Sequence, residues 1–182
     1  DVSGVGKGRR QELVNSAEGQ ILDCDLSLDG KEILFSWRRS QREGYHVFAI
    51  GVDGSGLRQL TEGPQHDYNA CWLPDGGIAY LTSRSPQFAY CWHAPVGVLY
   101  RMNADGSNPR KLSANYLNDF TPAVLDDGRI IYTRWEYVDR PAIPIQSLWT
   151  INPDGTNLAG YFGNRVLSPG TFMEARQIPG TT

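Results

Sequence analysis

The chain has 182 residues, of which 40% are hydrophobic, and a formal net charge of −3 at pH 7. This length favours one globular domain with a core of its own. The 17 basic residues are scattered without forming a run, which argues against a nucleic-acid partner. No apolar stretch is long enough to span a membrane.

Residues 1–20 form an entry segment without a regular hydrophobic period. Within it, residues 10–14 (Arg-Gln-Glu-Leu-Val) look like a degenerate copy of residues 58–61 (Arg-Gln-Leu-Thr). Because residues 58–61 end a repeat, we expect the entry segment to supply the outer strand of a preceding repeat unit.

From residue 21 onward, one pattern occurs three times. Its first half is a strand, an Asp-Gly turn and a second strand, with the turn glycines at Gly30, Gly76 and Gly128. Asp-Gly tolerates the positive φ that a two-residue hairpin turn requires, so each copy predicts a β-hairpin.

The second half of each copy is another hairpin with the same turn chemistry. Its turn glycines are Gly54, Gly106 and Gly155. Each unit therefore contains four strands in about fifty residues, which is the signature of a propeller blade.

The sequence thus predicts an all-β fold with about three four-stranded blades in residues 21–165. Residues 166–182 are expected to begin a further blade, because residues 169–178 have the pattern of a first strand. Propellers usually close with four to eight blades. We therefore expect the chain to be part of a larger ring of about six or seven blades, completed by other domains or subunits.

Because the four strands of a blade alternate in direction, successive connections lie alternately on two faces of the propeller. The Asp-Gly turns share one face, whereas the loops between the second and third strands and the links between blades share the other. The second face has the longer loops, in residues 83–95 and 133–144. Long loops on a rigid scaffold often bind partners, and aromatic and arginine side chains are common anchors. The predicted binding face contains Arg84, Tyr90, Trp92, Asn118, Asp119, Arg134, Glu136 and Tyr137.

Cys91 and His93 are the candidate metal ligands on that face, since a thiolate and an imidazole two residues apart can share an ion. The alternative is a partly buried cysteine beside a histidine that is bonded to the backbone. Covalent attachment of haem requires Cys-x-x-Cys-His, which the sequence lacks. Arg84 and Arg134 either hold an anionic group or form salt bridges, for which Glu136 is a candidate partner.

The motifs Asp-Gly-Lys-x-Ile-x-Phe (residues 29–35) and Asp-Gly-Ser-x-x-Arg-x-Leu (residues 53–60 and 105–112) resemble TolB-type, or PD40, propeller repeats. The runs at residues 90–101 and 134–141 are similar to the middle propeller domain of hydrazine synthase alpha-subunit-like proteins. That resemblance implies a large extracytoplasmic protein in which a propeller lies beside c-type cytochrome segments, with haem c and zinc in the complete protein.

Three functions follow from these observations. The first is a scaffold and binding module of a hydrazine-synthase-like oxidoreductase, whose long-loop face packs against a haem-bearing domain. The second is a TolB-type protein-interaction propeller without a redox role. The third is a hydrolase with a site in the central channel, which is disfavoured because no carboxylate pair recurs toward the channel. The segment contains no complete catalytic site in any of these cases.

Overall fold

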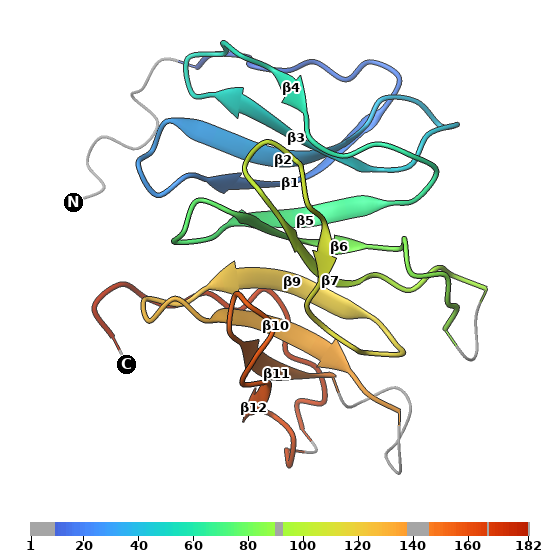
Figure 1. The fold of residues 1–182 in the computed structure, drawn as a ribbon, viewed down its shortest axis with the longest axis vertical. Helices are drawn as coiled ribbons and strands as arrows, with labels where there is room; N and C mark the ends of the chain where they lie inside the picture. Colours follow the sequence, from blue (N-terminus) through green and yellow to red (C-terminus); the bar gives the residue numbers. More distant parts are fainter. Residues whose placement is uncertain (1–9, 90–92, 138–145, 167, 182) are drawn as a thin grey trace.

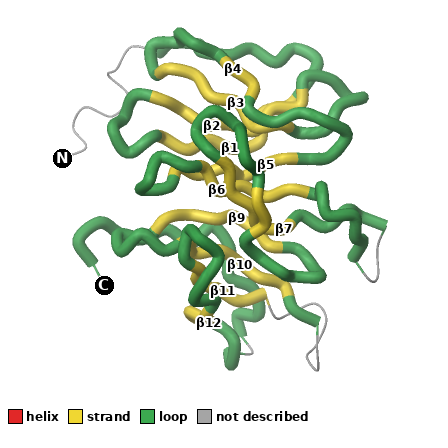
Figure 2. Tube along the Cα trace, in the orientation of Figure 1, coloured by secondary structure: helices red, strands yellow, loops and turns green. Residues whose placement is uncertain are grey.

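The computed structural model describes residues 10–89, 93–137, 146–166 and 168–181. These residues form twelve β-strands and contain no helix, and therefore no helix that could cross a membrane. The strands make three antiparallel four-stranded sheets that stack in chain order (Figures 1 and 2). The prediction of an all-β chain built from four-stranded blades is confirmed.

Each blade runs outward from its first strand to its fourth in sequence order. Blade 1 consists of β1 (Gln20–Leu26), β2 (Glu32–Arg38), β3 (His46–Gly51) and β4 (Arg58–Gln59). Blade 2 consists of β5 (Asp67–Trp72), β6 (Ile78–Thr82), β7 (Val98–Met102) and β8 (Arg110–Lys111). Blade 3 consists of β9 (Asp119–Val124), β10 (Ile130–Trp135), β11 (Gln146–Ile151) and β12 (Ala159–Phe162).

The Asp-Gly turns differ in one detail from the two-residue turns that the sequence predicts. At the β5–β6 turn, the Gly76 amide donates to the Leu73 carbonyl, and the Leu73 amide donates to the Gly77 carbonyl. Only the glycine has positive φ, 80° at Gly76, so the loop is a three-residue one that ends in a left-handed glycine. The Asp75 carboxylate accepts the Gly77 amide at 3.0 Å, which explains why aspartate precedes the glycine.

The first strand of each blade carries a β-bulge, which marks equivalent positions. Asn69 in β5 and Thr121 in β9 have φ values of 49° and 45°, and Glu174 has 56°. The Asn69 amide donates to Asp23 Oδ2 at 2.8 Å, which ties blade 2 to blade 1. The Glu174 amide donates to Thr121 Oγ1 at 3.2 Å, which ties the C-terminal segment to blade 3.

Apolar layers between the sheets form the core. The layer between blades 1 and 2 includes Leu34, Val47, Trp72 and Tyr80, all buried. The layer between blades 2 and 3 repeats this arrangement with the buried residues Cys71, Leu81, Leu99, Ile130 and Tyr132. Because both faces of blade 2 are covered, its strand β6 is buried along its whole length.

Segments outside the twelve strands cover part of the two outer sheet faces. Leu13 and Val14 pack on the Phe35–Phe48 cluster of blade 1. Phe172 and Ala175 pack on blade 3, where the Phe172 amide donates to the Gln146 carbonyl at 3.0 Å. The assignment of residues 1–20 to a preceding blade and of residues 166–182 to a following blade stays a prediction.

Trp72 offers a test of the layer between blades, because it is only 7% exposed and lies in the core between blades 1 and 2. We expect Trp72→Ala to lower the free energy of unfolding by about 3–5 kcal/mol, since it removes a large buried ring and leaves a cavity. The exposed ring of Phe88 provides the control, where Phe88→Ala should change stability by no more than about 0.5 kcal/mol. Urea unfolding of the two variants measures both values, and equal losses would contradict this account of the core.

Candidate functional site

The connections between strands separate onto two faces, as strand parity predicts. The turns β1–β2, β5–β6 and β9–β10 lie on the left in Figure 1, and the connections β2–β3, β6–β7 and β10–β11 leave on the right. We call the right-hand side the link face. Its described residues are 39–45, 62–66, 83–89, 93–97, 114–118 and 136–137.

Two predicted binding residues on this face, Arg84 and Arg134, form ion pairs inside the chain. Arg84 Nη2 lies 3.1 Å from Asp67 Oδ1, and Asp67 is completely buried. Arg134 Nε donates to Glu136 Oε1 at 3.0 Å, and its Nη1 donates to Ser113 Oγ at 3.2 Å. The salt-bridge alternative for both arginines is therefore what the structure shows.

Asp119 is also completely buried, at the position in blade 3 that Asp67 occupies in blade 2. Its carboxylate accepts the Leu99 amide at 3.0 Å and Asn115 Nδ2 at 3.0 Å. Burial raises its pKa and outweighs these hydrogen bonds and the charge of Arg134. Asn118, the preceding residue, accepts the Trp135 amide through its carbonyl. Both residues therefore fix the link between blades 2 and 3.

The exposed part of the link face carries aromatic side chains. Phe88 is 60% exposed, and Tyr137 is 38% exposed while its amide donates to the Tyr116 hydroxyl at 2.9 Å. His93 is exposed, with its ring 6.4 Å from the Phe88 ring. Tyr90, Cys91 and Trp92 lie outside the described residues.

The metal-site hypothesis for Cys91 and His93 stays a prediction, because Cys91 is outside the described residues. In the part of the chain that the structure describes, no group of three His, Cys, Asp or Glu side chains is arranged to hold a metal. The nearby carboxylates of Asp67 and Asp119 form contacts inside the protein.

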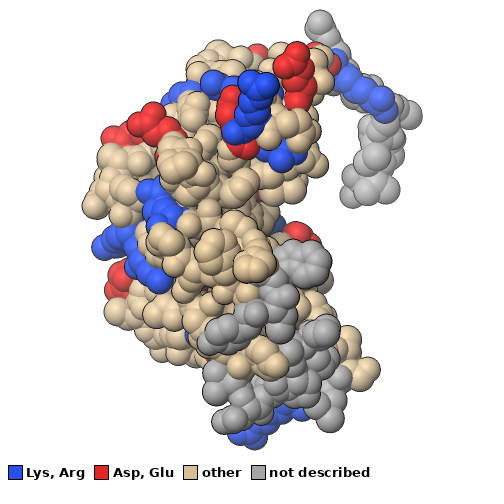
Figure 3. Space-filling view, turned by 90° about the vertical axis from the view of Figure 1, so that its right-hand side faces the viewer, with Lys and Arg blue, Asp and Glu red and all other residues tan. Residues whose placement is uncertain are grey.

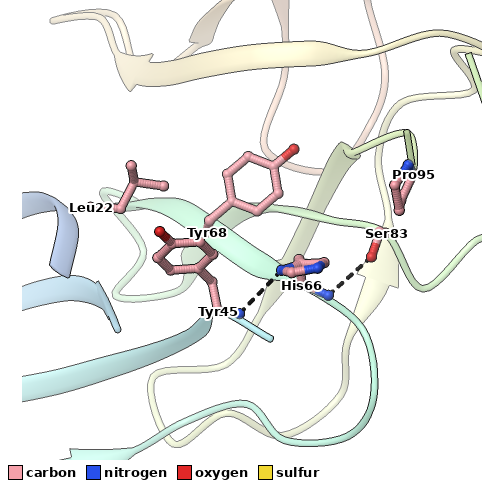
Figure 4. Close-up of a pocket in the computed structure, with 6 residues that line it drawn as sticks. All are labelled: Leu22, Tyr45, His66, Tyr68, Ser83 and Pro95. Carbon is pink, nitrogen blue, oxygen red and sulfur yellow. Dashed lines mark hydrogen bonds between the residues drawn. The ribbon is translucent and has the colours of Figure 1, made fainter. Parts of the chain in front are cut away.

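A pocket of about 220 Å³ opens where blades 1 and 2 meet at the link face. Six residues from both blades line it: Leu22, Tyr45, His66, Tyr68, Ser83 and Pro95. Figure 4 shows Leu22 and the rings of Tyr45 and Tyr68 on one side, Ser83 and Pro95 on the other, and His66 between them. The lining is mainly apolar, so the pocket suits an apolar group with a small number of polar contacts.

His66 has a defined tautomer in this pocket. Its Nδ1 accepts the Tyr45 amide at 3.2 Å, so the proton of the neutral ring is on Nε2. The His66 amide donates to Ser83 Oγ at 3.0 Å, which fixes the backbone (Figure 4). Burial lowers the pKa of His66, and the charges of Arg38 and His46 lower it further, against the opposing effect of Asp67. The ring is therefore neutral at pH 7 and offers an N–H donor.

Tyr68 completes the pocket as a neutral phenol. Burial raises its pKa to about 12, and the negative charge of Asp119 adds to this effect. Gly97 is close to its hydroxyl, and a Cβ atom at that position would clash with the phenol oxygen. A glycine in the long β6–β7 loop thus makes room for the ring.

A second, polar pocket of about 350 Å³ lies between the first strands of the blades. It is lined by Asp23 and Asp25 of β1, with Glu174 and Arg176 among the other residues. Burial raises the pKa of both aspartates. The Asp23 carboxylate accepts hydrogen bonds from the Ser36 hydroxyl and the Asn69 amide, and the Asp25 carboxylate accepts one from the Trp72 amide at 2.9 Å. Both carboxylates therefore hold blades 1 and 2 together. This use as structural ties gives the hydrolase alternative no support.

Sequence reasoning missed the link-face pocket. Tyr45 comes just before the third strand of blade 1, and Ser83 follows the second strand of blade 2. The only available signal was the coincidence of aromatic, histidine and hydroxyl residues at strand ends on one face. Which of them meet depends on how the two blades pack.

The low pKa of His66 leads to a prediction on pH dependence. In the unfolded chain a histidine takes up a proton near 6.5, whereas the folded protein keeps His66 neutral to lower pH. The stabilisation is therefore complete above 6.5 and is lost as the pH falls through the folded-state pKa. We expect NMR to show that the His66 imidazole titrates with a midpoint below pH 6.5. The variant His66→Gln should lose less free energy of unfolding than the parent protein when the pH is lowered. A midpoint at or above 6.5 would refute this description of the pocket.

Solved structures of similar fold come from several kinds of protein, while no family model matches the chain. A putative TolB from Agrobacterium tumefaciens superposes with a TM-score of 0.65 and 19% identity over 82% of this chain and 51% of that one. Hydrazine synthase from Kuenenia stuttgartiensis superposes with a TM-score of 0.68 and 18% identity over 79% of this chain and 25% of that one. A puromycin hydrolase superposes with a TM-score of 0.62 and 20% identity over 84% of this chain and 23% of that one.

The chain thus spans about half of the TolB structure and about a quarter of the other two. At these identities the likeness establishes the fold. The chain is a β-propeller segment whose blades resemble those of TolB and of hydrazine synthase.

Proposed function

We propose that the chain is a scaffold and binding module of a larger extracytoplasmic protein, and that its link face packs against a partner domain. The observation that carries this proposal is the contrast between the two faces. The turn face consists of short Asp-Gly turns, whereas the link face presents the exposed rings of Phe88 and Tyr137 on its longest connections. Exposed aromatic residues on loops held by a rigid scaffold are typical anchors of an interface.

The partner domain that we propose bears haem c. Support comes from the likeness of residues 90–101 and 134–141 to hydrazine synthase alpha-subunit-like propellers, and from the structural similarity to hydrazine synthase. The chain has no haem-attachment sequence, so the haem belongs to the partner domain and this chain shapes its surroundings. Other segments or subunits would complete the propeller ring.

A TolB-type interaction propeller without a redox role is the second candidate. The same link face favours it, because an aromatic surface serves any protein partner, and two TolB structures are among the similar folds. The visible absorption spectrum of the complete protein separates the two candidates, since only the first predicts the Soret and α bands of haem c.

Hydroxyl-radical footprinting of the complete protein tests the binding face. We expect Phe88 and Tyr137 to be oxidised much more slowly than their exposed fractions of 60% and 38% predict, because a partner domain covers them. Leu57 and Val52 are matched internal controls, since they are 47% and 44% exposed on the turn face and should react freely.

The variants Phe88→Ser and Leu57→Ser extend this test. Phe88→Ser should restore oxidation of Tyr137 by loosening the interface, and Leu57→Ser should have no such effect. Oxidation of Phe88 and Tyr137 at the rates that their exposure predicts would overturn the proposed function.

A further inference from the structure

The link-face pocket departs from the repeat of the blade junctions. The amides that begin β5 and β9 donate to the carbonyls of Tyr45 and Gly97, so these two residues occupy equivalent positions. By strand register, Leu22 of blade 1 is equivalent to Tyr68 of blade 2. Between blades 2 and 3 the Tyr68 hydroxyl lies close to Gly97, whereas between blades 1 and 2 the corresponding pair is Leu22 and Tyr45. The large ring thus moves from the first strand to the connection, and a pocket opens at this junction.

The walls of the pocket are held in place before any ligand binds. The Arg38 guanidinium lies over the Tyr45 ring at 5.3 Å, and the Tyr45 hydroxyl donates to Gln20 Oε1. His66 is fixed by hydrogen bonds at its Nδ1 and at its amide. A rigid pocket is best matched by a ligand that is itself stiff, because neither partner then loses much conformational entropy on binding.

The polar groups left over in the pocket are hydrogen-bond donors. Among the described residues, His66 Nε2 and the Ser83 hydroxyl donate to no acceptor. The nearby carbonyls are already used, since the Tyr45 carbonyl accepts the first amide of β5 and the His66 carbonyl accepts the Ser83 amide. No Lys, Arg, Asp or Glu is among the described residues that line the pocket. A ligand must therefore bring neutral acceptors, and a ligand N–H would find no free carbonyl here.

The surroundings of the pocket suit a protein segment. Figure 3 views the link face, where charged side chains lie mainly at the top and along the edges and the centre is mostly uncharged. Phe88 pairs with Pro95, which lines the pocket, so the pocket is continuous with the exposed aromatic surface. Its volume of about 220 Å³ fits side chains better than a cofactor, because ligand pockets are typically about 300–1,000 Å³.

A proline-containing segment in the polyproline II conformation meets each of these conditions. Proline has no backbone N–H, and the carbonyls of a polyproline II chain are not bonded within the chain. In a helix or a sheet, by contrast, most carbonyls are already engaged by backbone amides. Aromatic-lined grooves are a recurring site for such segments, because their conformation is largely formed before binding.

We propose that the pocket binds a proline-containing polyproline II segment of the partner domain. The proline ring packs against Tyr45 and Tyr68, and backbone carbonyls of the segment accept hydrogen bonds from His66 Nε2 and the Ser83 hydroxyl. The inference rests on the proposed function, because it names the segment that the partner presents to the link face. Binding involves apolar contacts and neutral hydrogen bonds alone.

The test uses the complete protein and a fluorescein-labelled peptide of sequence Ala-Pro-Pro-Leu-Pro-Pro-Ala, followed by fluorescence polarisation. Replacing the prolines by alanine should reduce affinity by about tenfold, because the ring contacts and the stiff conformation are lost. Affinity should change by less than about twofold when salt is raised from about 0.05 M to about 0.5 M, since no ion pair is involved. NMR should show slower exchange of the His66 Nε2 proton with water when the peptide is bound.

Two leucine variants supply the matched comparison. Leu22→Tyr gives blade 1 the ring that blade 2 has at this position, which fills the pocket and should weaken peptide binding by about tenfold. Leu22 is 48% exposed, so the fold should not depend on it. Leu57→Tyr adds the same ring at a leucine that is 47% exposed on the turn face and should leave affinity unchanged.

Three results would overturn the inference. They are equal affinity for the proline and the alanine peptide, strong weakening of binding by salt, and equal affinity of the two leucine variants. Proline-dependent binding that survives while Phe88 is freely oxidised would instead remove the proposed function and leave the proline site intact. Absence of any peptide binding, with Phe88 protected, would do the reverse.

Discussion

The face-to-face packing of four-stranded sheets is the constraint on which this structure depends. A blade buries both of its faces, so it cannot be stable by itself and needs a neighbour on each side. Blade 2 meets this need fully, since Leu34 and Val47 of blade 1 cover one face and Ile130 and Tyr132 of blade 3 the other. The need to cover every sheet face also explains why Leu13 and Phe172 lie against the two outer blades.

Polar groups within this packing are used to fix the links between blades. Asp67 and Asp119 occupy equivalent positions and are completely buried, and their carboxylates bind Arg84 in one case and Asn115 in the other. The Asp23 carboxylate of β1 accepts a hydrogen bond from the Asn69 amide of β5 and so ties the two blades in the same way. Because these carboxylates are already engaged inside the protein, they serve structure, and the proposed function uses the exposed rim of the link face instead.

The proposed function is placed on the link face for a physical reason. The loops of blades 2 and 3 offer exposed aromatic rings, which favour burial against a partner domain. The junction of blades 1 and 2 offers a pocket lined by Tyr45, His66 and Tyr68.

The sequence by itself determined the repeat, the four strands in each unit and the separation of turns from long loops, because these depend on local alternation and on Asp-Gly chemistry. It did not determine the three-residue form of the turns, since that follows from pairing such as Leu73 with Gly77. Only the tertiary structure decided that Asp119 is internal, that Arg84 is paired, and that Tyr45, His66 and Tyr68 line one pocket. The physical reason is that these contacts join residues of different strands and blades, and sequence spacing carries no information on how two sheets are rotated and packed against each other.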